Sequence, residues 1–371
     1  MLPQIKTKPE EQAEKASMKK LTIAGVEILA GTRQQIELPV AKLYTHTELS
    51  MTVKSIRGHR EGPTLFVSAA IHGDEINGVE IVRRLLQHKA LRSIRGTLLA
   101  IPIVNVHGFL NNSRYLPDGR DLNRSFPGSP KSSLAGRMAH TFLNDVVLQC
   151  THGIDLHTGA RHRSNLPQIR ADIKDKSTLA MAESFGAPVI LHSATRDGSL
   201  REIASANNIQ VLLYEAGEAL RFDEVAIRAG VSGILNVMRH IGMLPASRSK
   251  KPKRSSMITG QSAWLRATSS GTLSALVPLG AFVAKGSVLA IISDPLGDSS
   301  SDVEILASED GIVIGRTFLP LVYEGDALFH IAKYKADIEE ALEQVNAFRE
   351  AFEPEIYPIA DDYDDHPPIA G

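Results

Sequence analysis

The feature that most constrains the fold is the alternation of continuous apolar runs with amphipathic segments between residues 64 and 241. Strand-length apolar runs lie at residues 64–70, 97–104, 153–157, 188–192 and 209–214, and helical periodicity lies at 76–87, 133–149, 176–186, 199–206 and 222–241. Strands that are apolar on both faces must be covered on both faces, so this alternation predicts an α/β fold with a mostly parallel sheet between two layers of helices. Functional groups of such sheets gather at the carboxyl ends of the strands.

The composition is that of a soluble globular protein. Hydrophobic residues make up 43% and charged residues 22% of the 371 residues, and the formal net charge of −1 gives no bias toward nucleic acid or an anionic membrane. The single cysteine, Cys150, cannot form an internal disulfide, which is typical of a reducing compartment. No apolar run reaches the roughly 18 residues of a membrane span, and residues 1–20 are too polar for a signal peptide. We therefore expect a cytoplasmic protein.

Changes in composition divide the chain into five expected parts. These are a disordered leader at 1–19, an α/β domain at 20–245, a linker at 246–256, a small β domain at 257–333 and a helical, acidic tail at 334–371. The linker is inferred from the segment ASRSKKPKRSS, which is basic and rich in serine. Such a cluster can also contact nucleic acid, but no aromatic platform accompanies it, which favours a solvated linker.

The expected β domain contains an internal repeat. The pattern V-x-x-G-x-x-L occurs at 283–289 and again at 322–328, and the stretch resembles a biotinyl/lipoyl-type barrel, a two-sheet sandwich closed on itself. That family attaches its prosthetic group to a lysine in the hairpin between the two halves. Here the hairpin at 294–302 has no lysine, and Lys285 lies within a repeat instead. We therefore expect no swinging-arm carrier, and a β domain that shapes access to a site without supplying chemistry.

Potential metal ligands follow two of the predicted strands. His72 and Glu75 are three residues apart in H-G-D-E, directly after the run at 64–70, and His157 ends the run at 153–157. A surface helix start and a hydrogen-bonded strand-end histidine would explain each motif separately. Together the three side chains offer two nitrogens and a carboxylate at one sheet edge, which is the open coordination expected of a catalytic zinc site.

Two further groups have the chemistry of substrate recognition and acid/base catalysis. The loop after the second predicted strand contains Arg114 and then Asp121, Asn123 and Arg124 in D-L-N-R. Arginine and asparagine donors suit a carboxylate, although a solvated polar loop would look the same. Glu215 directly follows an apolar strand, where a carboxylate is costly to bury unless it has a partner or a catalytic role.

The ordered motifs H-G-D-E, D-L-N-R, D-L-H-T and E-A-G resemble the succinylglutamate desuccinylase/aspartoacylase family, which has a zinc carboxypeptidase-like fold. The resemblance covers about residues 45–245 and implies that the α/β domain is a zinc hydrolase. It implies one zinc ion per chain, bound by His72, Glu75 and His157. It also implies that Glu215 activates the water and passes its proton to the leaving amine.

The same resemblance assigns roles to the loop. Arg114 would polarise the scissile carbonyl and stabilise the oxyanion, while Asn123 and Arg124 would bind a substrate carboxylate. Asp121 would accept a hydrogen bond from His72 and so fix its tautomer. A PDGR segment lengthens the spacing from Arg114 to Asn123 relative to aspartoacylase.

The leading functional hypothesis is a zinc-dependent deacylase that cleaves the amide bond of an N-acyl amino acid or a related small molecule. It expects a small-molecule substrate, no nucleic-acid or membrane partner, and leaves a homo-oligomer open. A zinc carboxypeptidase acting on short peptides would use the same residues. A non-catalytic binding protein of the same fold is the alternative from another class. The acyl group and the amine portion stay open at this stage.

Overall fold

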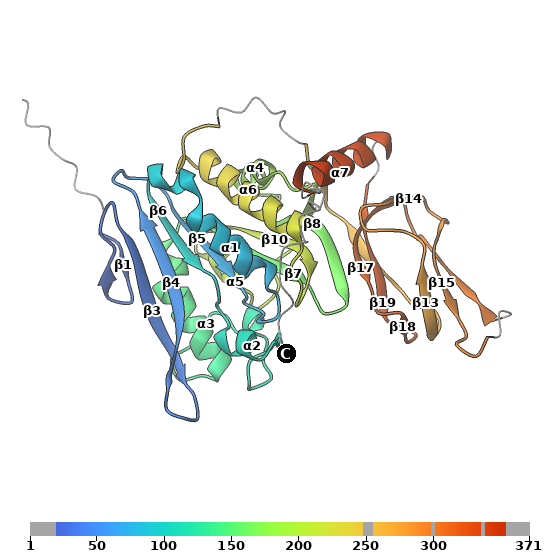
Figure 1. Cartoon of the computed structure of the whole chain (residues 1–371), viewed down its shortest axis with the longest axis horizontal. Coiled ribbons are helices and arrows are strands. Elements are labelled where there is room, and N and C mark those ends of the chain that lie inside the picture. The colour runs from blue at the N-terminus through green and yellow to red at the C-terminus, as the bar shows by residue number, and fades with distance from the viewer. Residues whose placement is uncertain (1–19, 248–254, 298–300, 335–337, 354–371) are drawn as a thin grey trace, which may run out of the picture.

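The computed structural model describes residues 20–247, 255–297, 301–334 and 338–353. The predicted leader, most of the predicted linker and the acidic tail lie outside these described residues. A helix-flanked α/β domain stands beside a smaller β domain, and one sheet runs through both (Figure 1). No helix in the described ranges is long and apolar enough to cross a membrane.

The α/β domain contains ten strands and six α-helices within its described residues. Its strands are β1 Thr22–Ile23, β2 Val26–Glu27, β3 Arg33–Lys42, β4 Glu48–Arg57, β5 Thr64–Ala69, β6 Thr97–Ile101, β7 His152–Gly159, β8 Arg163–Ala171, β9 Val189–His192 and β10 Gln210–Glu218. Its helices are α1 Asn77–Gln87, α2 Val106–Leu110, α3 Leu134–Asp145, α4 Lys176–Phe185, α5 Leu200–Ala206 and α6 Glu224–His240.

The main sheet is mixed, so the prediction of a mostly parallel sheet is wrong. Its order across the α/β domain is β8-β10-β7-β5-β6-β4-β3. Strands β10, β7, β5 and β6 are parallel, but β4 runs antiparallel to β6 and β8 runs antiparallel to β10. The reason is the length of the connections: residues 160–162 alone join β7 to β8, and such a short turn can only send the chain back.

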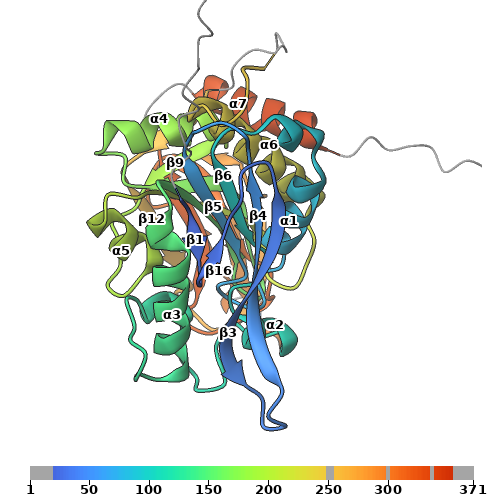
Figure 2. The ribbon, with the colours of Figure 1, turned by 90° about the vertical axis from the view of Figure 1, so that its left-hand side faces the viewer.

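Helices cover both faces of this sheet, as the apolar runs predict (Figure 2). Side chains alternate along β5, where Leu65 and Val67 pack in the core beneath α1, α4 and α6, and Phe66 packs in the core beneath α3 and α5. The helices begin and end at residues suited to those places. For example, Asp175 caps α4 by accepting hydrogen bonds from the first turn, and Gly186 ends it with a φ of 81°.

The β domain contains two packed sheets and is followed by one helix. Its elements are β11 Met257–Thr259, β12 Ser262–Arg266, β13 Gly271–Ala275, β14 Phe282–Val283, β15 Val288–Ser293, β16 Val303–Leu306, β17 Gly311–Thr317, β18 Leu321–Val322, β19 Ala327–Lys333 and α7 Ile338–Phe352. One sheet has the order β16-β15-β13-β18, and the other continues the main sheet through β17, β19 and β12.

The internal repeat has a direct structural counterpart. The repeated valines, Val283 and Val322, and the repeated leucines at 289 and 328 are all buried in the core of the β domain. Gly286 and Gly325 both form turns with φ of 85° and 89°, a conformation that side chains other than glycine rarely adopt. Each copy of the pattern therefore encodes a buried strand end, a tight turn and a second buried strand.

Backbone pairing joins the two domains along a seam. Strand β17 pairs with the first half of β8, where Thr317 lies opposite Arg163, and β11 pairs in parallel with β9. Figure 1 shows β17, in orange, lying beside the green β8. The side chains of Leu166 and Ile314 belong to one apolar cluster that spans this seam. The β domain is thus hydrogen-bonded to the edge of the main sheet of the α/β domain.

Candidate active site

The H-G-D-E turn places two of the expected ligands at the end of β5. After Ala69 the chain turns at Ala70, whose φ is 51°, and reaches α1 within a few residues. Gly73 permits this path, because a Cβ there would lie 2.0 Å from the backbone of Gly108 in α2. The turn therefore depends on glycine, and it directs His72 and Glu75 toward the end of the neighbouring strand β7.

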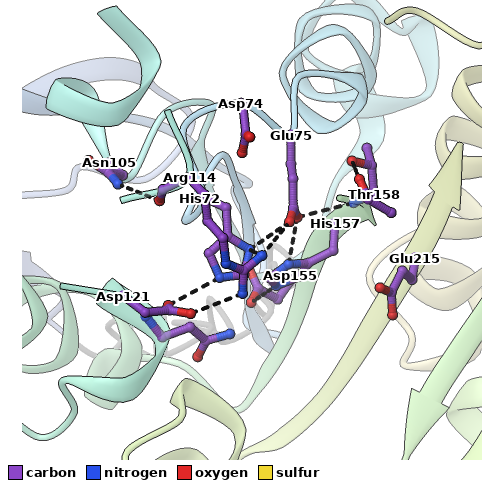
Figure 3. A network of polar contacts seen from close by, with 12 residues as sticks. His72, Asp74, Glu75, Asn105, Arg114, Asp121, Asp155, His157, Thr158 and Glu215 are labelled. Atoms are coloured by element: carbon purple, nitrogen blue, oxygen red, sulfur yellow. Dashed lines mark hydrogen bonds and ion pairs between the residues drawn. The ribbon is translucent and has the colours of Figure 1, made fainter. Parts of the chain in front are cut away.

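His72, Glu75 and His157 form a buried cluster (Figure 3). Glu75 Oε1 lies 2.8 Å from His72 Nδ1, and Glu75 Oε2 lies 2.8 Å from His157 Nδ1. One ligand atom from each residue falls within 4.8 Å of the other two, and each side chain is at most 5% exposed. Two imidazole nitrogens and a carboxylate are the donors of an open zinc site, so these residues could hold that metal.

Each histidine is held from behind by a second carboxylate. His72 Nε2 lies 3.2 Å from Asp121 Oδ1, and His157 Nε2 lies 2.8 Å from Asp155 Oδ2. Both Nδ1 atoms therefore face the centre of the cluster while both Nε2 atoms face a carboxylate, which is the usual support of metal-binding histidines. Sequence reasoning missed Asp155. Its signal was the D-L-H spacing, because residues i and i+2 of a strand lie on the same face.

The electrostatics of the cluster suit a cation. Burial alone would raise the pKa of Glu75, but the adjacent His72 and His157 hold that pKa well below its usual range. Burial alone would lower the pKa of His157, but Asp155 and Glu75 raise it to about 10. The carboxylates that favour the protonated form of His157 would also favour a divalent cation, and metal binding would displace that proton.

Arg114 and Asp121 lie beside the cluster on the loop side. Arg114 Nη1 donates to Glu75 Oε1 at 3.1 Å, and its Nη2 donates to Asp121 Oδ2 at 2.9 Å. The PDGR segment forms a closed turn in which the amide of Leu116 donates to the carbonyl of Arg120 at 3.1 Å. The extra residues therefore loop out, and Asp121 returns to the side of Arg114.

Asn123 and Arg124 line a cavity that lies over the His/Glu/His cluster. Asn123 is buried, and its Oδ1 accepts a hydrogen bond of 2.9 Å from the amide of Leu200 at the start of α5. The exposed guanidinium of Arg124 donates to the carbonyl of Asn123. Asn123 thus ties the D-L-N-R loop to α5 with its oxygen.

Glu215 reaches the cavity from β10. It lies opposite His157 in the parallel pairing of β10 with β7, so both residues stand at the same sheet edge. Its carboxylate forms an ion pair with Arg170, with Nε and Oε2 2.6 Å apart. Figure 3 shows Glu215 to one side of the cluster, on the strand beyond His157.

A cavity of about 290 Å³ lies over these residues. Arginines outnumber carboxylates on its wall. The carboxylates are Glu75, Asp155 and Glu215, and the arginines are Arg114, Arg124, Arg163, Arg170, Arg196 and Arg201. Trp264 of the β domain also contributes to the wall. Sequence reasoning missed the four arginines beyond the D-L-N-R loop as well as Trp264, because they lie in segments that have no catalytic motif.

Arg201 illustrates the excess of positive charge. Its guanidinium donates to the carbonyls of Ser193 and Ala194 and to the hydroxyl of Ser193, at 3.1–3.2 Å. These acceptors are neutral. Burial and the nearby Arg170 lower its pKa to about 10, so the guanidinium stays charged at neutral pH. A half-buried cation whose hydrogen-bond acceptors are all neutral favours an anionic ligand in the cavity.

The mixed, helix-flanked sheet and the buried His/Glu/His cluster at its edge define an α/β enzyme with a candidate metal centre. Residues 61–241 match the model of the succinylglutamate desuccinylase/aspartoacylase catalytic domain. The catalytic domain belongs to this family, and the chain is a hydrolase of that type.

Relatives with known names match most of the chain. The N-alpha-acetyl-L-2,4-diaminobutyric acid deacetylase of Halomonas elongata is 26% identical over 308 residues, which cover 80% of this chain and 90% of the relative. Among solved structures, a succinylglutamate desuccinylase/aspartoacylase from Rhodobacter sphaeroides shares the fold with a TM-score of 0.72 and 23% identity, covering 82% of this chain and 96% of that one. The product-bound ectoine utilization protein EutE (DoeB) from Ruegeria pomeroyi matches with a TM-score of 0.73 and 22% identity, covering 83% and 97% of the two chains.

Proposed function

We propose that this protein is a zinc-dependent deacylase that cleaves the amide bond of an N-acyl amino acid or a related small molecule. The observation that supports the proposal most directly is the buried cluster of His72, Glu75 and His157, whose ligand atoms converge within 4.8 Å at the floor of an arginine-rich cavity. The related deacetylase of Halomonas elongata, named for an N-acetylated diamino acid, supports the same reaction class.

One zinc ion per chain would bind to His72, Glu75 and His157. When bound, zinc lowers the pKa of a coordinated water toward neutrality and polarises the carbonyl of the substrate. Asp121 and Asp155 keep the two imidazole rings in the orientation that such binding requires, since each accepts from an Nε2 atom.

Glu215 acts in this proposal as the general base and then as the general acid. Its carboxylate accepts a proton from the attacking water and delivers it to the nitrogen of the leaving amine. The ion pair with Arg170 fixes the carboxylate at the cavity wall, opposite His157 on the neighbouring strand.

Arg114 supplies positive charge to the scissile carbonyl. Its guanidinium already lies beside Glu75, and a donor placed where negative charge develops stabilises the transition state by roughly 3–4 kcal/mol in comparable enzymes. Arg124 and the amide nitrogen of Asn123 bind the carboxylate of the amino acid portion. The Oδ1 atom of Asn123 is already engaged by Leu200, so only the nitrogen is left for the substrate.

The size of the cavity favours small substrates over peptides. Pockets for drug-sized ligands typically measure roughly 300–1,000 Å³, and this one measures about 290 Å³. Part of its wall comes from Trp264 of the hydrogen-bonded β domain, which limits its extent on that side. A cytoplasmic location stays a prediction, and a homo-oligomeric state stays open.

A substrate screen tests the proposal. Zinc-loaded protein is assayed with N-acetyl, N-succinyl and N-aspartyl amino acids, and with short peptides that have free carboxyl termini. Release of the free amino acid from at least one N-acyl compound, with slower cleavage of peptides, is the expected result. Preferential cleavage of peptides would favour a carboxypeptidase, and no turnover of any compound by zinc-loaded protein would contradict the proposal.

A further inference from the structure

Glu215 is the last residue of β10 before the regular strand pairing is interrupted. Between Glu215 and Glu218, residues 216 and 217 of β10 face only Thr158 of β7. The register with β8 shifts at the same point, between Glu215 and Gly217. Such an irregularity is a β-bulge, which gives a side chain a direction that a regular strand would not give it. The direction of Glu215 therefore depends on what holds the backbone just after it.

Asn77 holds this backbone from the beginning of α1. Its Nδ2 donates to the carbonyl of Ala216, the residue after Glu215, at 3.2 Å, and its Oδ1 accepts from the amide of Asp223 at 3.0 Å. Asn77 is 1% exposed and is the first residue of α1, directly after the H-G-D-E turn and one further residue. One buried side chain thus fastens both ends of the strand-end segment, residues 216–223, to the start of α1.

Further hydrogen bonds fix the middle of the strand-end segment. The amide of Leu220 donates to the carbonyl of Asp74 at 2.8 Å, and the amide of Ala219 donates to the carbonyl of Gly159 at 3.0 Å. Leu220 has a φ of 59°, a conformation that leucine rarely adopts, so these contacts outweigh its local preference. The segment is therefore bound to the ends of β5 and β7, where the proposed metal ligands lie.

Gly217 leaves room for the Asn77 side chain. The φ of Gly217 is 73°, and a Cβ at this position would lie 2.5 Å from Asn77 Nδ2. A larger residue would therefore strain the backbone and displace the nitrogen that binds the carbonyl of Ala216. The glycine of E-A-G and the asparagine that follows H-G-D-E thus fit each other, although they are far apart in the sequence.

Asn77 can influence a substrate only through the residues that it holds, because it is buried and does not line the cavity. The residue next to its bonded carbonyl is the proposed general base, Glu215. A general base must lie within hydrogen-bond reach of the water that it deprotonates. An error of about 1 Å in such a position can cost about 10²-fold in rate. The hydrogen bond from Asn77 to Ala216 is therefore placed where a small displacement has a large effect on turnover.

We propose that Asn77 is a positioning residue that sets the place of Glu215 relative to the His/Glu/His cluster, by binding the carbonyl of Ala216 at the bulge of β10. This inference deepens the proposed function and rests on it for the role of Glu215. It predicts a loss of turnover without a loss of metal or of substrate affinity. A purely structural role of the buried amide would instead lower stability and leave kcat of the folded protein unchanged.

The variant Asn77→Asp keeps the acceptor for Asp223 but replaces the donor to Ala216 by an oxygen. With an N-acyl amino acid that the wild type hydrolyses, its kcat should fall about 10²-fold while KM changes little. Its zinc content should equal that of the wild type. Asn207→Asp is the matched control, because Asn207 is exposed at the end of α5 and its Nδ2 also donates to a main-chain carbonyl, that of Ile203, at 2.7 Å. This control should retain the wild-type kcat.

The variant Gly217→Ala tests the same contact from the other side and introduces no charge. Its methyl group would occupy the place of Asn77 Nδ2, so kcat should fall while zinc is retained. Gly242→Ala is the control, because Gly242 has a φ of 79° but open space around an added Cβ, and it should keep the wild-type kcat. If only one of the two test variants folds, that variant decides. Wild-type kcat in either folded test variant, or a fall in kcat that an equal loss of zinc accounts for, would overturn the inference.

Hydrogen exchange tests the positioning without turnover. In zinc-loaded Asn77→Asp, the amides of the strand-end segment should exchange faster, while those of β5 and β7 should keep their wild-type protection. This result, in a protein that hydrolyses no N-acyl compound, would support the contact while contradicting the proposed function. Hydrolysis of N-acyl amino acids with wild-type kcat in both Asn77→Asp and Gly217→Ala would support the proposed function and exclude the positioning role.

Discussion

At the scale of single residues, the site combines a buried carboxylate with two histidines that are oriented from behind. Glu75 contacts both Nδ1 atoms, and the two Nε2 atoms face Asp121 and Asp155. The convergence of His72, Glu75 and His157 was predictable from motif spacing at the ends of apolar strands. Asp155 and the arginines of the far wall were not, because their roles depend on which strands become neighbours.

Replacing Glu215 by glutamine tests the proposed acid/base role. Glutamine is nearly isosteric but cannot accept the proton of the water, so kcat should fall by roughly 10²–10⁴ while zinc content and the fold are retained. Steady-state kinetics together with metal analysis measure both quantities. Glu183→Gln, on α4 and outside the cavity, is the control and should have no effect. A decrease in kcat of less than about tenfold in Glu215→Gln would exclude Glu215 as the essential base.

The contact between Asp155 and His157 leads to a second prediction at this scale. Asparagine at position 155 keeps the shape of the side chain but removes the charge that orients the imidazole, so zinc affinity should fall roughly 10- to 100-fold. Competition with a chelator of known affinity measures the change. Asp172→Asn changes an exposed carboxylate just beyond β8 and should leave the zinc affinity unchanged. An unaltered affinity in Asp155→Asn would show that His157 does not need this support.

At the scale of elements, the sequence predicted most of the strands and helices but missed β8. This strand reads RSNLPQIRA and contains Pro167 and several polar residues, which argue against a central strand. Its partners explain its burial: β10 pairs with it on one side, β17 and β9 on the other, and Gln168 Nε2 donates to the carbonyl of Ile314 across the seam. These contacts come from distant parts of the chain, so local patterns cannot reveal them.

The repeat in the β domain makes a quantitative prediction about stability. Leu328 and Leu289 are both 0% exposed at equivalent positions, so truncating either to alanine should reduce the free energy of unfolding by about 2–5 kcal/mol. Leu321, on the neighbouring strand β18, is 64% exposed, and its alanine variant should differ from wild type by less than about 0.5 kcal/mol. Urea denaturation measures all three. A small effect at one leucine and a large effect at the other would argue against equivalent halves.

At the scale of the whole molecule, the seam makes one structure of two domains. The basic segment predicts a flexible connection, and most of it lies outside the described residues. Strand β11 nevertheless begins at Met257 and pairs with β9, and β17 extends the main sheet beyond β8. The apolar cluster of Leu166 and Ile314 packs across the same line. Strand pairing across the boundary therefore places Trp264 on the cavity wall as a fixed residue.

This continuity predicts cooperative unfolding. Trp264 reports the seam, and far-ultraviolet circular dichroism reports mainly the helices of the α/β domain, so the two signals should have the same denaturation midpoint. Two separate transitions, with the fluorescence change first, would show that the β domain unfolds on its own. Ile314→Ala should lower the shared midpoint without dividing the transition, because it weakens the packing at the seam.

The most direct test of the account is the zinc content of the protein with and without His157. Wild-type protein, dialysed after zinc loading, should retain about one zinc ion per chain by elemental analysis, and His157→Ala should retain almost none, because the cluster then has only two of its three ligands. His59→Ala removes an exposed histidine outside the cavity and should keep the wild-type content. Stoichiometric zinc in a folded His157→Ala protein would contradict the proposed metal centre, and with it the proposed deacylase mechanism.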